Sequence, residues 1–187
     1  MSDLIFGLAL SIGVLALIGK PATIAADVTN HVLGFLFSFT ILIMVWMRYS
    51  RIISVLPVET RAEVMLNVAL LFLVSIEPYL LSILTGGESA PKEYASVLYA
   101  LDLAGLMAIL AVFTHALTSE RSLIKPELKA QQKQARNLLV LTTVMFLVSL
   151  EPVFWAWTIA GSPVRYYLWG IPLVLGWISR TITAAKK

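Results

Sequence analysis

Six long apolar stretches separated by short polar segments dominate the pattern of this sequence. They are roughly Leu4–Gly19, Val32–Met47, Val64–Leu84, Tyr94–Leu117, Leu138–Ile159 and Val164–Ile182. Most approach the ~20 residues that a helix needs to cross ~30 Å of hydrocarbon. The first is shorter and requires a thinner bilayer or cover from its neighbours. None alternates with the period of two that is typical of barrel strands. The pattern predicts an all-α fold with six transmembrane helices.

The first apolar stretch has two unlike faces. One face repeats at i, i+3, i+4 and i+7 and consists of Leu4, Leu8, Ser11, Ile12 and Leu15. The opposite face carries the small residues Ala9, Gly13 and Ala16. Because small residues let membrane helices approach closely, we expect this second face to pack within the protein. The first face is then not needed for packing within the protein and remains free to line another surface.

Composition supports a membrane protein. The 187 residues are 59% hydrophobic and only 13% charged, and the mean hydropathy is +0.86, far from a soluble domain of this length. The first stretch lacks a basic leader and an obvious cleavage site, so we expect it to be retained rather than removed as a signal peptide. We predict one multi-pass domain spanning residues 1–187.

The basic residues predict the orientation of the six helices. One side of the membrane holds Arg48, Arg51, Arg61, Arg121, Lys125, Lys129, Lys133, Arg136, Arg180, Lys186 and Lys187. The other side holds Lys20, Lys92 and Arg165. This asymmetry predicts that both termini are cytoplasmic. It also accounts for the net charge of +3 without a nucleic-acid partner.

The residues that enzymes and metal sites require are scarce. The chain has no cysteine, and its two histidines, His31 and His115, are far apart in sequence. No nucleophile elbow, phosphate-binding glycine loop or paired-histidine metal motif occurs. We therefore expect neither an enzyme nor a bound cofactor.

Three carboxylates fall within the apolar stretches. Glu77 and Glu151 each precede a proline in an internal echo, Phe72–Pro78 and Phe146–Pro152, and Asp102 lies in the fourth stretch. Ionisable groups inside a membrane suggest function. A protonated Glu can instead hydrogen-bond backbone groups at a proline kink, and this structural interpretation is favoured. The alternative is a proton-coupled transporter that uses Glu77, Asp102 and Glu151 as a relay.

The start of the sixth stretch carries a charge and several aromatic residues. Arg165 follows Ser162-Pro163, which is typical of a helix start. We expect Arg165 to mark the outer end of this helix, with Tyr166, Tyr167 and Trp169 as anchors at the membrane interface.

Positions in the first four stretches resemble a known family in order and spacing. Ser2-Asp3 and the face that follows are similar to the first helix of the transmembrane protein 175 family of potassium channels, whose signature is Arg-x-x-x-Phe-Ser-Asp before an apolar helix. The later stretches are also similar to this family. The residues concerned are Ser38-Phe39 with Trp46 in the second stretch, Asn67 with Pro78 in the third, and Tyr99-Ala100-Leu101-Asp102-Leu103 in the fourth. The chain departs from the family at Met1, in place of Phe, at Tyr49, in place of His, and at Asp102, in place of Asn.

The resemblance implies a homotetramer of prokaryotic type in the cell membrane, surrounded by lipid and conducting potassium ions. The first helix of each subunit would line the pore with Leu4, Leu8, Ser11, Ile12 and Leu15. Apolar rings there would gate by dewetting, and the Ser11 hydroxyls would replace part of the ion's hydration shell. The residues expected to anchor this helix are Ser2, Asp3, Trp46, Asn67 and Asp102. Potassium in transit is the only metal that we expect.

Overall fold

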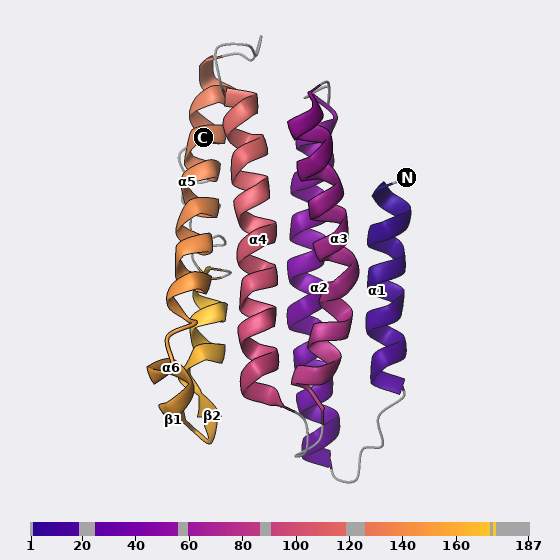
Figure 1. Ribbon diagram of the computed structural model, residues 1–187, viewed down its shortest axis with the longest axis vertical. Helices are drawn as coiled ribbons and strands as arrows, with labels where there is room; N and C mark the ends of the chain where they lie inside the picture. The colour runs from indigo at the N-terminus through magenta and orange to yellow at the C-terminus, as the bar shows by residue number, and fades with distance from the viewer. Residues whose placement is uncertain are drawn as a thin grey trace.

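The computed structural model describes residues 2–18, 25–55, 60–86, 91–118, 126–172 and 174. Its elements are α1 (Ser2–Ile18), α2 (Ala25–Ile53), α3 (Arg61–Leu84), α4 (Lys92–Thr118), α5 (Pro126–Val148), α6 (Val153–Ala156), β1 (Thr158–Ile159) and β2 (Ser162–Pro163). A further helical segment covers 164–172. The long helices lie side by side, with α1 at one edge of the bundle and α5 towards the other (Figure 1). All long elements are therefore helical, as predicted.

Within the described residues, three helical ranges are long and apolar enough to cross a membrane. They are His31–Ile53, Arg61–Leu84 and Lys92–Thr118. With 17 residues, α1 is about 26 Å long at ~1.5 Å per residue. It is thus somewhat shorter than a typical hydrocarbon core, as its sequence predicts.

Local sequence signals explain where α3 begins and how it continues past a proline. Thr60 accepts a hydrogen bond from the backbone N–H of Glu63 at 3.2 Å, and the Glu63 carboxylate accepts one from the Thr60 N–H at 2.9 Å. This reciprocal pair forms a capping box. Pro78 lies inside the helix, which ends at Leu84 as predicted.

The fifth predicted span was wrong in its second half. We expected one helix over Leu138–Ile159, but α5 ends at Val148. The chain then forms the short helix α6 and a hairpin in which Thr158 pairs with Pro163 and Ile159 with Ser162. Ala160 and Gly161 make the turn with φ of 50° and 80°, which matches the twist of a tight hairpin.

The internal echo therefore has two different structures. Glu77-Pro78 lies within α3, whereas Glu151-Pro152 follows the end of α5. The Ser75 hydroxyl donates to the Leu71 carbonyl four residues back, whereas the Ser149 hydroxyl donates to the Phe146 carbonyl three residues back. The two similar sequences therefore adopt different local structures.

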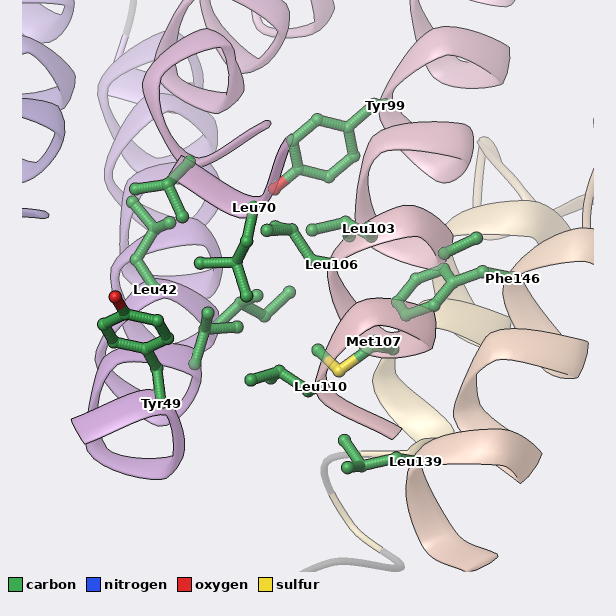
Figure 2. Packing of buried hydrophobic residues seen from close by; sticks show 14 of the residues in the cluster. Leu42, Tyr49, Leu70, Tyr99, Leu103, Leu106, Met107, Leu110, Leu139 and Phe146 are labelled. Atoms are coloured by element: carbon green, nitrogen blue, oxygen red, sulfur yellow. The ribbon is translucent and has the colours of Figure 1, made fainter. Parts of the chain in front are cut away.

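The core of the protein is built around α4. Leu103, Leu106 and Leu110 are buried on this helix. Figure 2 shows them between Leu42 and Leu70 on one side and Phe146 on the other. Since apolar packing inside a membrane depends on close contact between side chains, α4 fixes the positions of its neighbours.

Gly34 allows a close approach of α2 to α3. A Cβ atom added at Gly34 would lie 2.9 Å from Cγ2 of Thr85. We expect Gly34→Ala to reduce the free energy of unfolding by about 1–3 kcal/mol, because the two helices must separate. Thermal unfolding in detergent measures this effect. Gly170→Ala is the matched control, since an added Cβ there meets nothing within 4 Å. A Gly34→Ala protein as stable as the wild type would contradict the prediction.

Candidate functional site

One face of α1 is not covered by the rest of the subunit. It consists of Leu4, Leu8, Ser11, Ile12 and Leu15, and every one of these residues is exposed. The exposed fraction is 65% for Leu4 and 63% for Leu15. We call this set the exposed face of α1. It carries no charge and one hydroxyl group, at the edge of the bundle (Figure 1).

The other face of α1 packs within the subunit, mainly against α3 and α2. Phe6 and Ala9 are buried, and the Phe6 ring lies 5.7 Å from the Tyr49 ring, centroid to centroid. Gly13 packs against Phe35 closely enough that an added Cβ would lie 3.4 Å from its ring. The expected small-residue packing is thus present at Ala9 and Gly13, while the Ala16 side chain lies outside the described residues.

The single hydroxyl of the exposed face has its proton engaged. Ser11 Oγ donates to the Gly7 carbonyl oxygen at 2.9 Å. A serine hydroxyl has one donor and two acceptor lone pairs. Because the donor is used along the helix, the lone pairs of Ser11 remain available to a cation or to water.

Hydrogen bonds connect α1 to α2 and α2 to α3. Trp46 Nε1 donates to the Asp3 carboxylate at 2.9 Å, and the Tyr49 hydroxyl donates to Asn67 Oδ1 at 2.7 Å. Tyr49 therefore contacts Asn67 from the position where the resembling family has a His. Ser2 is half-buried in the first turn of α1. The structure brings Asp3, Trp46 and Asn67 to these two helix junctions, but places Asp102 elsewhere, beside Glu77.

Removing the Trp46 hydrogen bond should loosen the start of α1. We expect Trp46→Phe to cost about 0.5–1.5 kcal/mol and to increase motion of the first turn. Since the chain has no cysteine, a spin label on Leu4→Cys reports this motion without background. Trp157→Phe, which replaces an exposed residue of the hairpin, is the control. Equal label mobility in both variants would contradict the anchoring role of Trp46.

Two of the three intramembrane carboxylates lie together. Glu77 is fully buried, and its Oε1 accepts hydrogen bonds from the Ser38 hydroxyl at 2.6 Å and the Tyr99 hydroxyl at 2.8 Å. Asp102 is also buried, and it lies one helical turn along α4 from Tyr99, whose hydroxyl contacts Glu77. Glu151 is exposed beyond the end of α5. The structure therefore joins Glu77 with Asp102 but does not bring Glu151 into the described network.

Arg165 has a different environment from the one expected. It begins the helical segment 164–172, as predicted, but only 1% of it is exposed. Its guanidinium donates to the Ser149 carbonyl at 2.7 Å, to the Leu150 carbonyl at 3.1 Å and to the Ser96 hydroxyl at 2.6 Å. Arg165 thus binds the carbonyl groups that follow α5 and connects them to α4.

The expected interfacial role of Trp169 was also wrong. Trp169 is buried, and its ring centroid lies 5.3 Å from those of Tyr99 and Tyr166. Its Nε1 donates to the Ser149 hydroxyl at 3.0 Å. Tyr167 is exposed, whereas Tyr166 is half-buried. Sequence alone did not reveal this cluster, because its partners come from three separate segments.

The described residues form no cluster that could hold a metal ion, and the cavity found among them is apolar. No three His, Asp or Glu side chains in the described ranges are grouped so that they could hold a metal ion. An apolar cavity of about 270 Å³ lies between α2, α4, α5 and the segment 164–172. Its described lining includes no residue of α1 and neither buried carboxylate. The exposed face of α1 is therefore the candidate site.

The apolar helices define an integral membrane protein. Residues 1–78, which contain α1, α2 and most of α3, match the family model described as "Endosomal/lysosomal potassium channel TMEM175". Over these residues the chain is similar to this family of potassium channels, which is not an enzyme family. Searches of curated proteins and of solved structures found no match. The match supports the family resemblance over residues 1–78, which include the whole exposed face of α1, and does not extend to Tyr99-Ala100-Leu101-Asp102-Leu103.

Proposed function

We propose that four copies of this chain form a potassium-permeable channel whose pore is lined by the exposed face of α1. The observation that carries this proposal is the lack of cover on Leu4, Leu8, Ser11, Ile12 and Leu15 within the subunit. Lipid alone could cover an apolar face, but this face also presents hydroxyl lone pairs and lies within the residues that match the channel family.

Symmetry turns single side chains into rings. In a closed tetramer, each residue that faces the axis occurs four times at one level of the pore. Leu8, Ile12 and Leu15 then form stacked apolar constrictions that gate by dewetting. Ser11 contributes a ring of hydroxyl oxygens between them, and these oxygens replace part of the hydration shell of a passing potassium ion.

The N-terminal end of α1 suits the entrance of a cation pore. Asp3 is exposed in the first turn of the helix. Its carboxylate accepts only the Trp46 hydrogen bond among the contacts of the described residues. A negative charge held at the mouth raises the local concentration of cations.

The proposal extends to the whole chain as one domain, residues 1–187. Its six transmembrane helices would include α1 to α5 and the helix that begins at 164, with both termini in the cytoplasm. The expected location is a prokaryotic cell membrane. The apolar face and the match to the channel family over 1–78 favour this arrangement over a monomeric carrier.

Potassium flux from liposomes tests the proposal. Purified protein should release trapped potassium, and native mass measurement should give four chains. In Ile12→Cys protein, a thiol reagent should reduce the flux, because the introduced thiol lines the pore. The same reagent should leave Val144→Cys unaffected, since Val144 is exposed on α5.

Two results would contradict the channel. The first is an absence of potassium flux from the wild type. The second is flux that depends on a proton gradient and disappears in Glu77→Gln, which would support the proton-coupled carrier. A channel lined by α1 should keep its potassium flux in Glu77→Gln, because this residue is buried away from the exposed face.

A further inference from the structure

A pair of acidic side chains lies inside the bundle, away from the exposed face of α1. Glu77 is 0% exposed on α3, and Asp102 is 4% exposed on α4. Each lies on a helix that is apolar and long enough to cross a membrane. Two ionised carboxylates in such a place would repel each other and would both lack hydration.

The two oxygens of Glu77 have different environments. Oε1 accepts hydrogen bonds from Ser38 on α2 and from Tyr99 on α4. Oε2 has no hydrogen-bond partner among the described residues, and neither has Oδ1 or Oδ2 of Asp102. Three buried oxygens without a donor are unusual, since buried polar groups are nearly always hydrogen-bonded.

No basic side chain of the described residues is bonded to the pair. Among the described residues, no Lys, Arg or His makes a hydrogen bond to either carboxylate. The titratable group that contacts Glu77 is Tyr99, whose hydroxyl acts as a donor. Ser38, the partner from α2, is not titratable. A proton held between the two carboxylates gives Oε2 and one oxygen of Asp102 a partner and removes one of the two negative charges.

We infer that Glu77 and Asp102 form an intramembrane proton-binding site, in which one proton shared by the two carboxylates holds α3 against α4 while Ser38 ties the pair to α2. This site is separate from the proposed pore and does not depend on it.

The hydrogen-bond pattern places the proton. Because Oε1 of Glu77 already accepts two hydrogen bonds, the shared proton lies between Oε2 and an oxygen of Asp102. The proton comes from water, and the pair then has a single negative charge instead of two. Its loss would return the proton to water and leave both carboxylates ionised and facing each other.

Infrared spectroscopy of the full chain tests the site directly. In a maltoside detergent, which has no ester carbonyl, the wild type at neutral pH should show the C=O stretching band of a protonated carboxylic acid. The band should shift in D₂O, disappear as the pH rises, and stay the same when sodium replaces potassium. Asp102→Asn should abolish it, because the amide donates permanently to Glu77 and leaves that residue ionised.

Glu151→Gln is the control, since it removes an exposed carboxylate outside the pair. This variant should keep the band. Absence of the band from the wild type would overturn the inference and would point to a bound metal cation. Persistence in Asp102→Asn would also overturn it, because Glu77 would then hold a proton alone. If Asp102→Asn does not fold, the wild-type spectra decide: a band that is insensitive to alkaline pH or that depends on sodium would overturn the site.

Discussion

Replacing Ile12 with Asn is expected to raise potassium efflux from liposomes by about tenfold or more. In the proposed tetramer, four Ile12 side chains form an apolar ring that excludes water. Amide groups at the same level keep the pore hydrated, so the barrier to the ion falls. A tenfold change needs only ~1.4 kcal/mol from the barrier. Potassium efflux measured at equal protein content in the liposomes checks this expectation.

A matched substitution separates a pore effect from general leakiness. Val144→Asn introduces the same amide at a residue that is exposed on α5, far from α1 in the bundle (Figure 1). It should leave efflux within about twofold of the wild type, a difference of ~0.4 kcal/mol in the barrier. Equal increases in both variants would show that the amide disturbs the protein or bilayer in general, and the pore assignment to α1 would fail.

Arg165→Met is expected to reduce the free energy of unfolding by about 3–5 kcal/mol. Methionine fills part of the space but donates no hydrogen bond. The Ser149 and Leu150 carbonyls and the Ser96 hydroxyl would lose a charged donor at once. Hydrogen bonds to charged groups contribute ~1.5–3 kcal/mol each, and removal of one member of a buried network is costly. Unfolding by denaturant in detergent, followed by tryptophan fluorescence, measures the change.

The control for Arg165 is a second arginine that makes no such contacts. Arg61 is exposed at the first position of α3, so Arg61→Met should change the free energy of unfolding by no more than ~0.5 kcal/mol. If both variants unfold at the same denaturant concentration, the contacts of Arg165 do not stabilise the packing of the segment 164–172 against α4 and the end of α5.

Helix positions were predictable wherever one local pattern decided the structure. The predicted stretch Val64–Leu84 differs from α3 only at its start, because the Thr60–Glu63 capping box adds a turn before the apolar run. The two faces of α1 followed from helical periodicity alone. In these segments, the spacing of apolar residues and the end signals agree with each other.

The end of α5 could not be predicted locally. The apolar pattern continues past Val148, and Pro152 resembles Pro78, which α3 accommodates. The difference lies in Arg165, which binds the carbonyls of Ser149 and Leu150 and so stabilises a chain that leaves the helix there. Such a partner lies 15 or 16 residues away, beyond any helical period.

The polar network could not be predicted from local sequence either. Ser38, Glu77 and Tyr99 lie on three different helices, and only tertiary packing reveals that both hydroxyls donate to one carboxylate oxygen. The sequence identified Glu77 and Asp102 as unusual for a membrane, but could not distinguish a relay of three carboxylates from a pair. Because Glu151 is exposed, the described network contains the pair Glu77 and Asp102 and not a relay of three carboxylates.

The contacts of Arg165 also have a consequence for how the protein is made. Ribosomes add ~5–20 residues per second, so Arg165 follows Ser149 by roughly one to three seconds during synthesis. Until then, the carbonyls beyond α5 must be solvated by water or by lipid headgroups, because a bilayer core leaves no room for unpaired backbone groups. In the proposed six-helix arrangement, the fifth helix and the helix that begins at 164 would therefore enter the membrane as one hairpin, completed when Arg165 reaches its carbonyls.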